Sequence, residues 1–420
     1  MKIFKNKIRK YIIITGLVST FAVVGLIITY YNSTPKEEPL IGAYINGTYS
    51  DTLPSKDSGY AVEKIVCDNN KNASWDYNKW GIKLSNWGTR SRCNIYFKSL
   101  ETITIVNKTF YLDEAQRCPT MNSDGTVTVT GGEDTYGYLC KAKDAYGDSY
   151  YYRGNVTNNY VLFADKYWRI VRINGDGTVR VIYDGTSAHA NGESSTDKQI
   201  GESAFNGSYN YNANDNAYVG YMYGQTGAST YAETHANTNN STIKTYLDTW
   251  YENNIKGTTN EQYIADNIFC NDRSIVSNNS GTGAGTSETY YRWYYFANNS
   301  NNNKMMLTCP QKNDAFTVND TSNGNGALTY GVGLVTTDEV VLAGGWNSYN
   351  PNYYLYSGQD YWTMSPYSFY NGHAFERFVN SGSSAGGIQV YCDFGARPVF
   401  NLKSEVLLQG TGTASDPYHA

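Results

Sequence analysis

The chain has 420 residues, a formal net charge of −5 and only 17% charged residues, whereas tyrosine (41 residues) and glycine (40 residues) are abundant. A nucleic-acid-binding surface needs clustered lysine and arginine, and no such cluster occurs after residue 10. The composition therefore argues against a nucleic-acid partner. It favours a loop-rich chain with much β structure.

The N-terminal end has the pattern of a membrane anchor. Residues 1–10, MKIFKNKIRK, are basic and form the predicted cytoplasmic tail. Residues 11–32 are uncharged and mostly apolar, and about 20 such residues cross a bilayer as a helix. The basic cluster stays in the cytoplasm. We therefore predict a signal anchor at 11–32 and a single-pass protein of the cell membrane with an extracellular C-terminal ectodomain. A cleaved signal peptide, which has a shorter apolar core, is the alternative.

Residues 33–39 are predicted to be a linker, and residues 40–100 a small β stalk domain. A domain of this size buries little apolar surface, so a disulfide between Cys67 and Cys93 would stabilise it. The tryptophans of this domain either fill its core or form a carbohydrate-binding platform: Trp75, Trp80 and Trp87.

The seven cysteines include no C-x-x-C pair and no Cys/His cluster at zinc spacing. We therefore predict no metal and no cofactor, and disulfides formed in an oxidising compartment. The spacing suggests local pairs, although sequence alone does not fix the connectivity: Cys67 with Cys93, Cys118 with Cys140, and Cys270 with Cys309. Cys392 is left over.

Residues 101–420 form the predicted main domain. Its clearest hairpin has two β-rich runs on either side of the NGDGT turn at 174–178, where Asn-Gly and Asp-Gly favour positive φ. A calcium loop would need a bidentate glutamate that is missing here. We therefore interpret this stretch as a hairpin turn.

Two amphipathic helices are expected to pack on the sheet. Ile243 and Leu247 belong to an apolar pattern at helical spacing, which Ser241 can cap and Gly257 can end. In the second helix, Thr336 and Glu339 form a capping-box pattern before Gly344.

Two long irregular segments, residues 278–304 and 344–362, separate these elements. A compact domain usually keeps such segments for function or leaves them disordered. Three strand-like runs then close the domain, namely AFERFV, GIQVYC and RPVFNLK. Arg397, directly before Pro398, is expected to pair with a buried acid or a carbonyl.

Several motifs together carry a family resemblance: YWRIVRINGDGTVRVIY, STIKTYLDTWYENNI, YWTMSP and GARPVFNLKSEV. Residues 105–415 thereby resemble exported, membrane-anchored bacterial proteins with a C-type-lectin-like domain of the formylglycine-generating-enzyme type. The resemblance implies an α+β fold with flanking helices and long loops. Retroelement-diversified variable proteins share that fold, and residues 367–394 are similar to their variable region in composition.

Aromatic side chains and small polar ones are concentrated near the C-terminus, as they are in evolved binding surfaces. We predict that these residues contact a ligand: Trp346, Tyr349, Tyr353, Tyr354, Tyr356, Tyr367, Phe369, Tyr370, Asn371, His373, Arg377 and Asn380. The predicted function is ligand binding or adhesion at the cell surface, with an unknown protein or glycan as partner.

Enzymatic function has weaker support in the sequence. His189 and His235 both occur in HAN triplets. They are either two polar contacts around one pocket or ordinary loop histidines. The enzyme type named above uses a pair of late cysteines, and here Cys392 alone is left over. The alternatives kept open are an exported enzyme of that type, another cell-envelope enzyme, and a passive surface protein.

Overall fold

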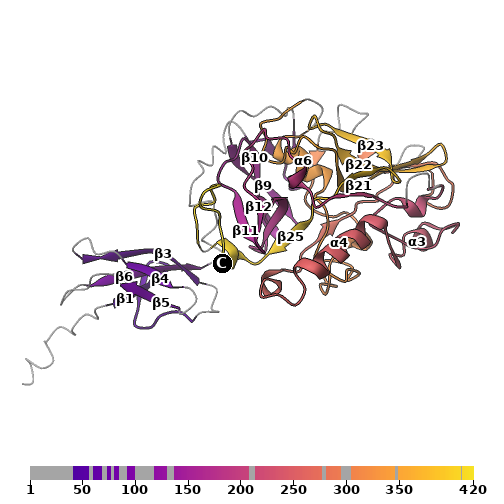
Figure 1. Ribbon diagram of the computed structural model, residues 1–420. Coiled ribbons are helices and arrows are strands. Elements are labelled where there is room, and N and C mark those ends of the chain that lie inside the picture. The colour runs from indigo at the N-terminus through magenta and orange to yellow at the C-terminus, as the bar shows by residue number, and fades with distance from the viewer. Residues whose placement is uncertain are drawn as a thin grey trace, which may run out of the picture. The chain divides into compact units, whose positions relative to one another are not determined.

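The computed structural model divides the chain into two compact units, Met1–Thr102 and Ile103–Ala420 (Figure 1). The structure describes residues 41–55, 60–68, 73–76, 80–84, 92–99, 118–129, 137–207, 213–276, 281–294, 304–345, 349–407 and 409–420. The two units are treated separately below.

The small unit is a β domain with an aromatic core. Its main sheet has the order β2-β1-β6-β3, and β4 pairs with β5. The rings of Trp75 and Trp80 both pack on Phe97, with centroids 5.4 and 6.4 Å from it. These two tryptophans therefore fill the core, whereas Trp87 lies outside the described residues. The strands are β1 (Ile41–Ile45), β2 (Thr48–Ser50), β3 (Tyr60–Cys67), β4 (Ala73–Asp76), β5 (Gly81–Leu84) and β6 (Cys93–Ser99).

The first sheet of the large unit begins and ends with strands far apart in the sequence. Its order is β25-β13-β12-β10-β9, and β11 pairs with β12. The late strand β25 lies beside β13, with Val181 opposite Phe400. The strands are β9 (Gly137–Asp144), β10 (Gly147–Gly154), β11 (Tyr160–Phe163), β12 (Lys166–Ile173), β13 (Val179–Gly185) and β25 (Val399–Leu402).

The second sheet contains the C-terminal hairpin. Its order is β14-β24-β21-β22-β23, and β18 pairs with β21. Asn371 and Gly372 connect β21 to β22, both with positive φ, as the Asn-Gly turn of a two-residue hairpin requires. The strands are β14 (Glu202–Ala204), β18 (Thr289–Tyr290), β21 (Tyr361–Tyr370), β22 (His373–Val379), β23 (Ala385–Gln389) and β24 (Asp393–Gly395).

The rest of the large unit consists of short strands, paired in twos or in the three-stranded sheet β19-β8-β7, and of short helices. The short strands are β7 (Thr120–Met121), β8 (Val127–Thr128), β15 (Met222–Tyr223), β16 (Asn239–Asn240), β17 (Phe269–Cys270), β19 (Lys304–Met305) and β20 (Ala315–Phe316). The short helices are η3 (Thr196–Lys198), η4 (Asn216–Tyr218), α3 (Tyr231–Thr234), η5 (Glu261–Tyr263), η6 (Lys312–Asp314) and η7 (Ser404–Leu407).

Both predicted helices form. Helix α4 (Thr242–Asn254) is capped by Ser241 and buries Ile243 and Leu247. Helix α6 (Thr337–Ala343) has the capping box of Thr336 with Glu339 and ends at Gly344 in the left-handed region. Unlike an amphipathic helix, however, α6 is buried on every side and contacts both β10 and β21. It lies between the two sheets in Figure 1.

The predicted α+β class is wrong, because the described chain is predominantly β. Many of its strands have only two or three residues, too short to produce an alternating pattern in the sequence. The predicted C-type-lectin-like arrangement with flanking helices is therefore corrected to a predominantly β architecture.

The predicted membrane anchor also gains no support. No helix in the part of the chain that the structure describes is long and apolar enough to cross a bilayer. The predicted tail (1–10), anchor (11–32) and linker (33–39) themselves lie outside the described residues. As a correction to the predicted single-pass membrane localisation, the described residues supply no spanning helix.

The hairpin turn at NGDGT (174–178) is confirmed, and its geometry recurs at NSDGT (122–126). Asp176 accepts hydrogen bonds from the backbone and side chain of Thr178 at 3.0 and 2.6 Å. Asp124 makes the same two bonds to Thr126, at the same distances. In both turns the aspartate carboxylate accepts hydrogen bonds from the threonine two residues later in the same turn. This explains the Asp-Gly pattern without a calcium ion.

All three predicted disulfides are confirmed: Cys67–Cys93, Cys118–Cys140 and Cys270–Cys309. Cys93 is opposite Cys67 in the pairing of β6 with β3, so that bond joins neighbouring strands. Cys270 belongs to β17, which pairs with β20. The third disulfide therefore links β17 to Cys309, a few residues before β20, and closes the segment between these two paired strands into a ring.

Candidate functional site

A cluster of buried charges lies where the first sheet meets α6. Glu339 Oε1 is 3.0 Å from Arg172 Nε and 2.5 Å from Arg180 Nε, although the latter nitrogen is not aligned for a hydrogen bond. Arg172 also pairs with Asp144 at 2.7 Å. Burial would raise the pKa of Glu339, but Arg180 and Arg172 outweigh it and lower the pKa below its ordinary value.

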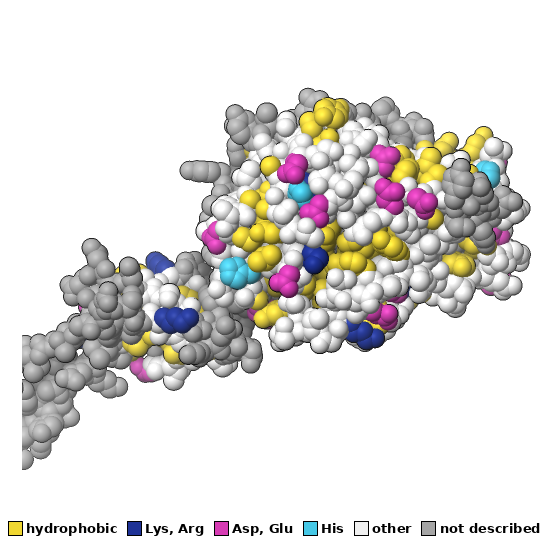
Figure 2. Space-filling model, in the orientation of Figure 1, with side chains coloured by type: hydrophobic (Ala, Val, Ile, Leu, Met, Phe, Trp, Pro, Cys, Tyr) yellow, Lys and Arg dark blue, Asp and Glu magenta, His cyan; other side chains and the backbone are white. Residues whose placement is uncertain are grey.

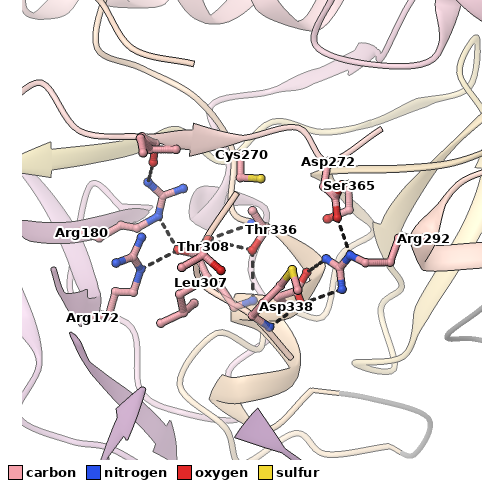
Figure 3. Close-up of a pocket in the computed structure, with 13 residues that line it drawn as sticks. Arg172, Arg180, Cys270, Asp272, Arg292, Leu307, Thr308, Thr336, Asp338 and Ser365 are labelled. Atoms are coloured by element: carbon pink, nitrogen blue, oxygen red, sulfur yellow. Dashed lines mark hydrogen bonds and ion pairs between the residues drawn. The ribbon is translucent and has the colours of Figure 1, made fainter. Parts of the chain in front are cut away.

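A second ion-pair group adjoins the first. Figure 3 shows Arg292 between Asp272 and Asp338, with ion pairs to both. Asp338 also accepts from the indole N–H of Trp293 at 2.8 Å and from the backbone N–H of Met306 at 3.0 Å. Asp338 and Glu339 are adjacent in the first turn of α6. The first turn of α6 therefore pairs with Arg172 and Arg180 through Glu339, and with Arg292 through Asp338.

These charges surround a cavity of about 20 Å³. A space of that size holds a water molecule rather than a substrate. Its arginines and acids pair with one another, and Cys270 in its wall is already in a disulfide. We therefore assign this cluster a structural role, because each partner neutralises another buried charge and removing one partner would leave a charge buried and unpaired.

The twelve predicted ligand residues divide by exposure. Tyr349, Tyr370 and Asn371 are exposed, whereas Tyr367, His373 and Asn380 are half-buried. Trp346 lies outside the described residues. The exposure predicted for the remaining five is wrong, because all of them are buried: Tyr353, Tyr354, Tyr356, Phe369 and Arg377.

The buried tyrosines belong to an irregular segment that enters the core. Buried backbone needs hydrogen-bond partners, and two buried cations supply them here. Arg397 donates to the carbonyl of Leu355 at 2.7 Å, and Lys198 donates to the carbonyl of Tyr356 at 2.9 Å. Arg397 also pairs with Asp184 at 3.2 Å, which confirms its predicted structural role. Burial lowers the pKa of Lys198 to about 8.

Arg377, Asn371 and Asn380 have structural contacts of their own. Arg377 donates to the carbonyl of Ala385, and burial lowers its pKa to about 10. Asn380 accepts from the backbone N–H groups of Gly382 and Ser384 in the loop between β22 and β23, both at 2.9 Å. Asn371 is a turn residue. These contacts explain the three residues without a ligand.

Four tyrosines form a connected array beside the hairpin. The ring of Tyr290 lies 4.1 Å from that of Tyr294 and 5.9 Å from that of Tyr370, measured between centroids. The ring of Tyr294 lies 5.1 Å from that of Tyr367. Each is at least partly exposed. We call Tyr290, Tyr294, Tyr367 and Tyr370 the tyrosine row.

Sequence reasoning found only half of this row. Tyr367 and Tyr370 are among the predicted ligand residues, whereas Tyr290 and Tyr294 belong to the irregular segment 278–304, for which no ligand residue is predicted. Strand β18 brings them to the hairpin by pairing Tyr290 with Ser368. The sequence does hold a signal: residues 290–296 read YYRWYYF, an aromatic run like the one from which the other ligand residues are predicted.

The two histidines of the HAN triplets do not share a pocket. His189 lies between Glu193 and Asp197, with its ring nitrogens 2.8 and 2.9 Å from their carboxylates. His235 is fully buried beside Arg273. Burial is the larger cause and the positive charge of Arg273 the smaller cause of a pKa well below the ordinary value. Both are therefore structural histidines in separate networks.

Cys392 is a free, half-buried thiol. Burial raises the pKa of this thiol, and the negative charge of Asp393 raises it further. A nucleophilic cysteine needs a lowered pKa. Among the described residues, no group of three or more His, Cys, Asp or Glu side chains is placed to hold a metal ion.

The surface charge is also informative. On the face of the large unit seen in Figure 2, acidic side chains are scattered and basic ones are few. Among the side chains described there, no basic patch is visible that would attract a nucleic-acid backbone.

Comparison with known proteins found no matching family model, no matching curated protein and no matching solved structure. The resemblance of residues 105–415 to the formylglycine-generating-enzyme type therefore stays a prediction. The tyrosine row is the candidate functional site, on the strength of its own geometry.

Proposed function

We propose that this chain is a recognition protein, of the ligand-binding or adhesion type, and that the tyrosine row is the centre of its contact surface. The carrying observation is the connected array of Tyr290, Tyr294, Tyr367 and Tyr370, from half-buried to 47% exposed at Tyr370. Tyrosine supplies a large contact area at low entropic cost, because it has only two side-chain torsions.

The strands beneath the row support this proposal. Tyr290, Tyr367 and Tyr370 belong to β18 and β21, which pair with each other. The guanidinium group of Arg377 lies 5.1 Å from the ring centroid of Tyr367 and is itself buried. The rings are therefore held in place before binding, which reduces the entropy lost in the complex.

A protein partner fits this surface best. Tyrosine is enriched where proteins bind one another, and serine, glycine and asparagine commonly accompany it there. The three disulfides fit an oxidising compartment as the place of action. An oxidase of the formylglycine-generating type is less well supported, because the pKa of Cys392 is shifted away from reactivity.

The test is binding of the full chain, fluorescently labelled, to an array of purified bacterial and mammalian surface proteins. We expect at least one protein to be bound and its affinity to fall about tenfold or more in the double variant Tyr290→Ser/Tyr370→Ser. Tyr349→Ser is the matched control, because Tyr349 is 63% exposed and lies outside the row. An array on which no binding depends on the row would refute the proposal.

A further inference from the structure

A second surface of the large unit has different chemistry and shares no residue with the tyrosine row. It is an open groove of about 630 Å³ between the outer face of α4 and the strands β14, β15 and β16. Ligand sites commonly have volumes of about 300–1,000 Å³. The groove is lined by Ser203, Asn206, Gly207, Tyr218, Tyr223, Asn240, Ser241, Thr242, Thr245, Tyr246 and Thr249.

The lining contains no charged side chain and no aliphatic one. It consists of hydroxyl, amide and tyrosine side chains and one glycine. A charged ligand would find no counter-ion there, and a purely apolar ligand could not satisfy the remaining lone pairs of the hydroxyl oxygens. The lining therefore selects a ligand that is uncharged and rich in hydrogen-bonding groups.

Helix α4 shows how this wall arises. Its outer face carries residues at spacings of three and four, which lie on one side of a helix: Thr242, Thr245, Tyr246 and Thr249. The charges of the helix lie outside the groove lining: Lys244 is buried and pairs with Asp248 at 2.5 Å, and the exposed Glu252 accepts from the hydroxyl of Tyr330 at 2.6 Å. An exposed helix face of this kind usually carries lysine and glutamate. Here it carries hydroxyl groups.

The hydroxyl groups are oriented by the backbone. Thr245 Oγ1 donates to the carbonyl of Ser241 at 3.0 Å, and Thr249 Oγ1 donates to the carbonyl of Thr245 at 2.8 Å. A hydroxyl that donates its proton to the backbone keeps its oxygen lone pairs as acceptors. The helix wall therefore presents acceptors, which suit a ligand with many hydroxyl donors.

The groove lining also contains a pair of tyrosines outside α4. The rings of Tyr218 and Tyr223 lie 5.7 Å apart at 52° to each other and are half-buried. Tyrosine offers an apolar ring face together with a polar tip. Sugar rings have the matching chemistry, with C–H groups on their faces and hydroxyls at their edges.

We infer that this groove binds an uncharged oligosaccharide, with sugar faces against Tyr218 and Tyr223 and sugar hydroxyls donating to the threonines of α4. The open form of the groove suits several sugar units of a longer chain. This inference goes beyond the proposed function, because the tyrosine row has no part in it.

The experiment titrates the full chain with defined hexasaccharides and measures heat of binding and saturation-transfer NMR. The probes are cellohexaose, maltohexaose, mannohexaose and N-acetylchitohexaose, with hexagalacturonic acid as the charged comparison. We expect at least one neutral hexasaccharide to bind at millimolar concentration and the acidic one to bind at least tenfold more weakly. A chain that binds none of the four neutral probes, or binds the acidic one equally well, would overturn the inference.

Two variants locate the site. Tyr223→Ala should weaken binding about tenfold or more, as the loss of a central aromatic contact does. Thr245→Glu should abolish it by placing a charge in the groove, and it should fold normally because Thr245 is exposed. Asn253→Glu is the matched control, exposed on the same helix but outside the groove. Equal binding by Thr245→Glu and Asn253→Glu would contradict the assignment, whereas Tyr370→Ser should leave it unchanged.

Discussion

The tyrosines of the segment 353–356 and those of the tyrosine row have opposite environments. Tyr353 is fully buried, whereas Tyr370 is 47% exposed. In the first case an irregular segment enters the core, where Arg397 and Lys198 satisfy its carbonyl groups. In the second case a strand pair holds the rings at the surface. The comparison shows that residue type alone does not reveal a binding surface, because the backbone beneath it decides what is exposed.

The sharpest way to break this comparison is to truncate a buried tyrosine. Tyr353→Ala should lower the free energy of unfolding by about 3–5 kcal/mol, because removing a large buried side chain leaves a cavity. Urea unfolding followed by circular dichroism measures the change. A loss below about 1 kcal/mol would mean that the ring does not support the core.

In the β21–β22 hairpin, which carries Tyr367 and Tyr370, we expect a change in stability of intermediate size that depends on pH. Glu376 is fully buried in β22, and neither carboxylate oxygen has a well-formed hydrogen bond. Burial raises its pKa well above the ordinary value of 4.5, despite the nearby charge of Arg273. A raised folded-state pKa means that the contribution of Glu376 to stability is complete below about pH 4.5 and is lost as the pH rises towards the folded-state pKa.

We therefore expect Glu376→Gln to gain stability relative to the wild type as the pH rises from 5 to 9, by at most about 1.4 kcal/mol per pH unit. Urea unfolding at several pH values measures it. The exposed Glu202 gives the control variant Glu202→Gln, which should follow the wild type. A stability difference that does not change with pH would show that Glu376 is ionised in the folded protein.

The smallest effect is expected at the surface. Tyr370→Ala should change the free energy of unfolding by less than about 0.5 kcal/mol, since exposed substitutions rarely cost more. The same unfolding assay applies. A cost as large as that of Tyr353→Ala would place the ring of Tyr370 among the residues that hold the fold, and would remove it from the contact surface.

Local features were predictable from the sequence. The capping box of Thr336 with Glu339, the turn at 174–178 and the three disulfides each depend on residues close in the chain or on cysteine spacing. Their physical causes act over a few residues, or along one connecting segment, and therefore leave a pattern in the sequence.

Non-local features were not predictable. Tyr290 reaches Tyr370 only because β18 pairs with β21, and strands of two residues leave no alternating signal. The burial of Tyr353 depends on Arg397, whose partner carbonyl at Leu355 cannot be identified from spacing. Half of the candidate site was therefore missed, and five of its proposed members belong to the interior.

The third disulfide has a consequence for how this molecule could change over generations. Cys270 and Cys309, separated by 39 positions, close a ring that contains Tyr290 and Tyr294. The entropy of closing such a ring rises only slowly with its length. Extra residues within it therefore add little entropic cost, whereas Asp272, Arg292 and Trp293 inside the ring are fixed by buried contacts. Half of the tyrosine row thus lies on a covalently closed ring that can gain residues beside its fixed contacts at small entropic cost.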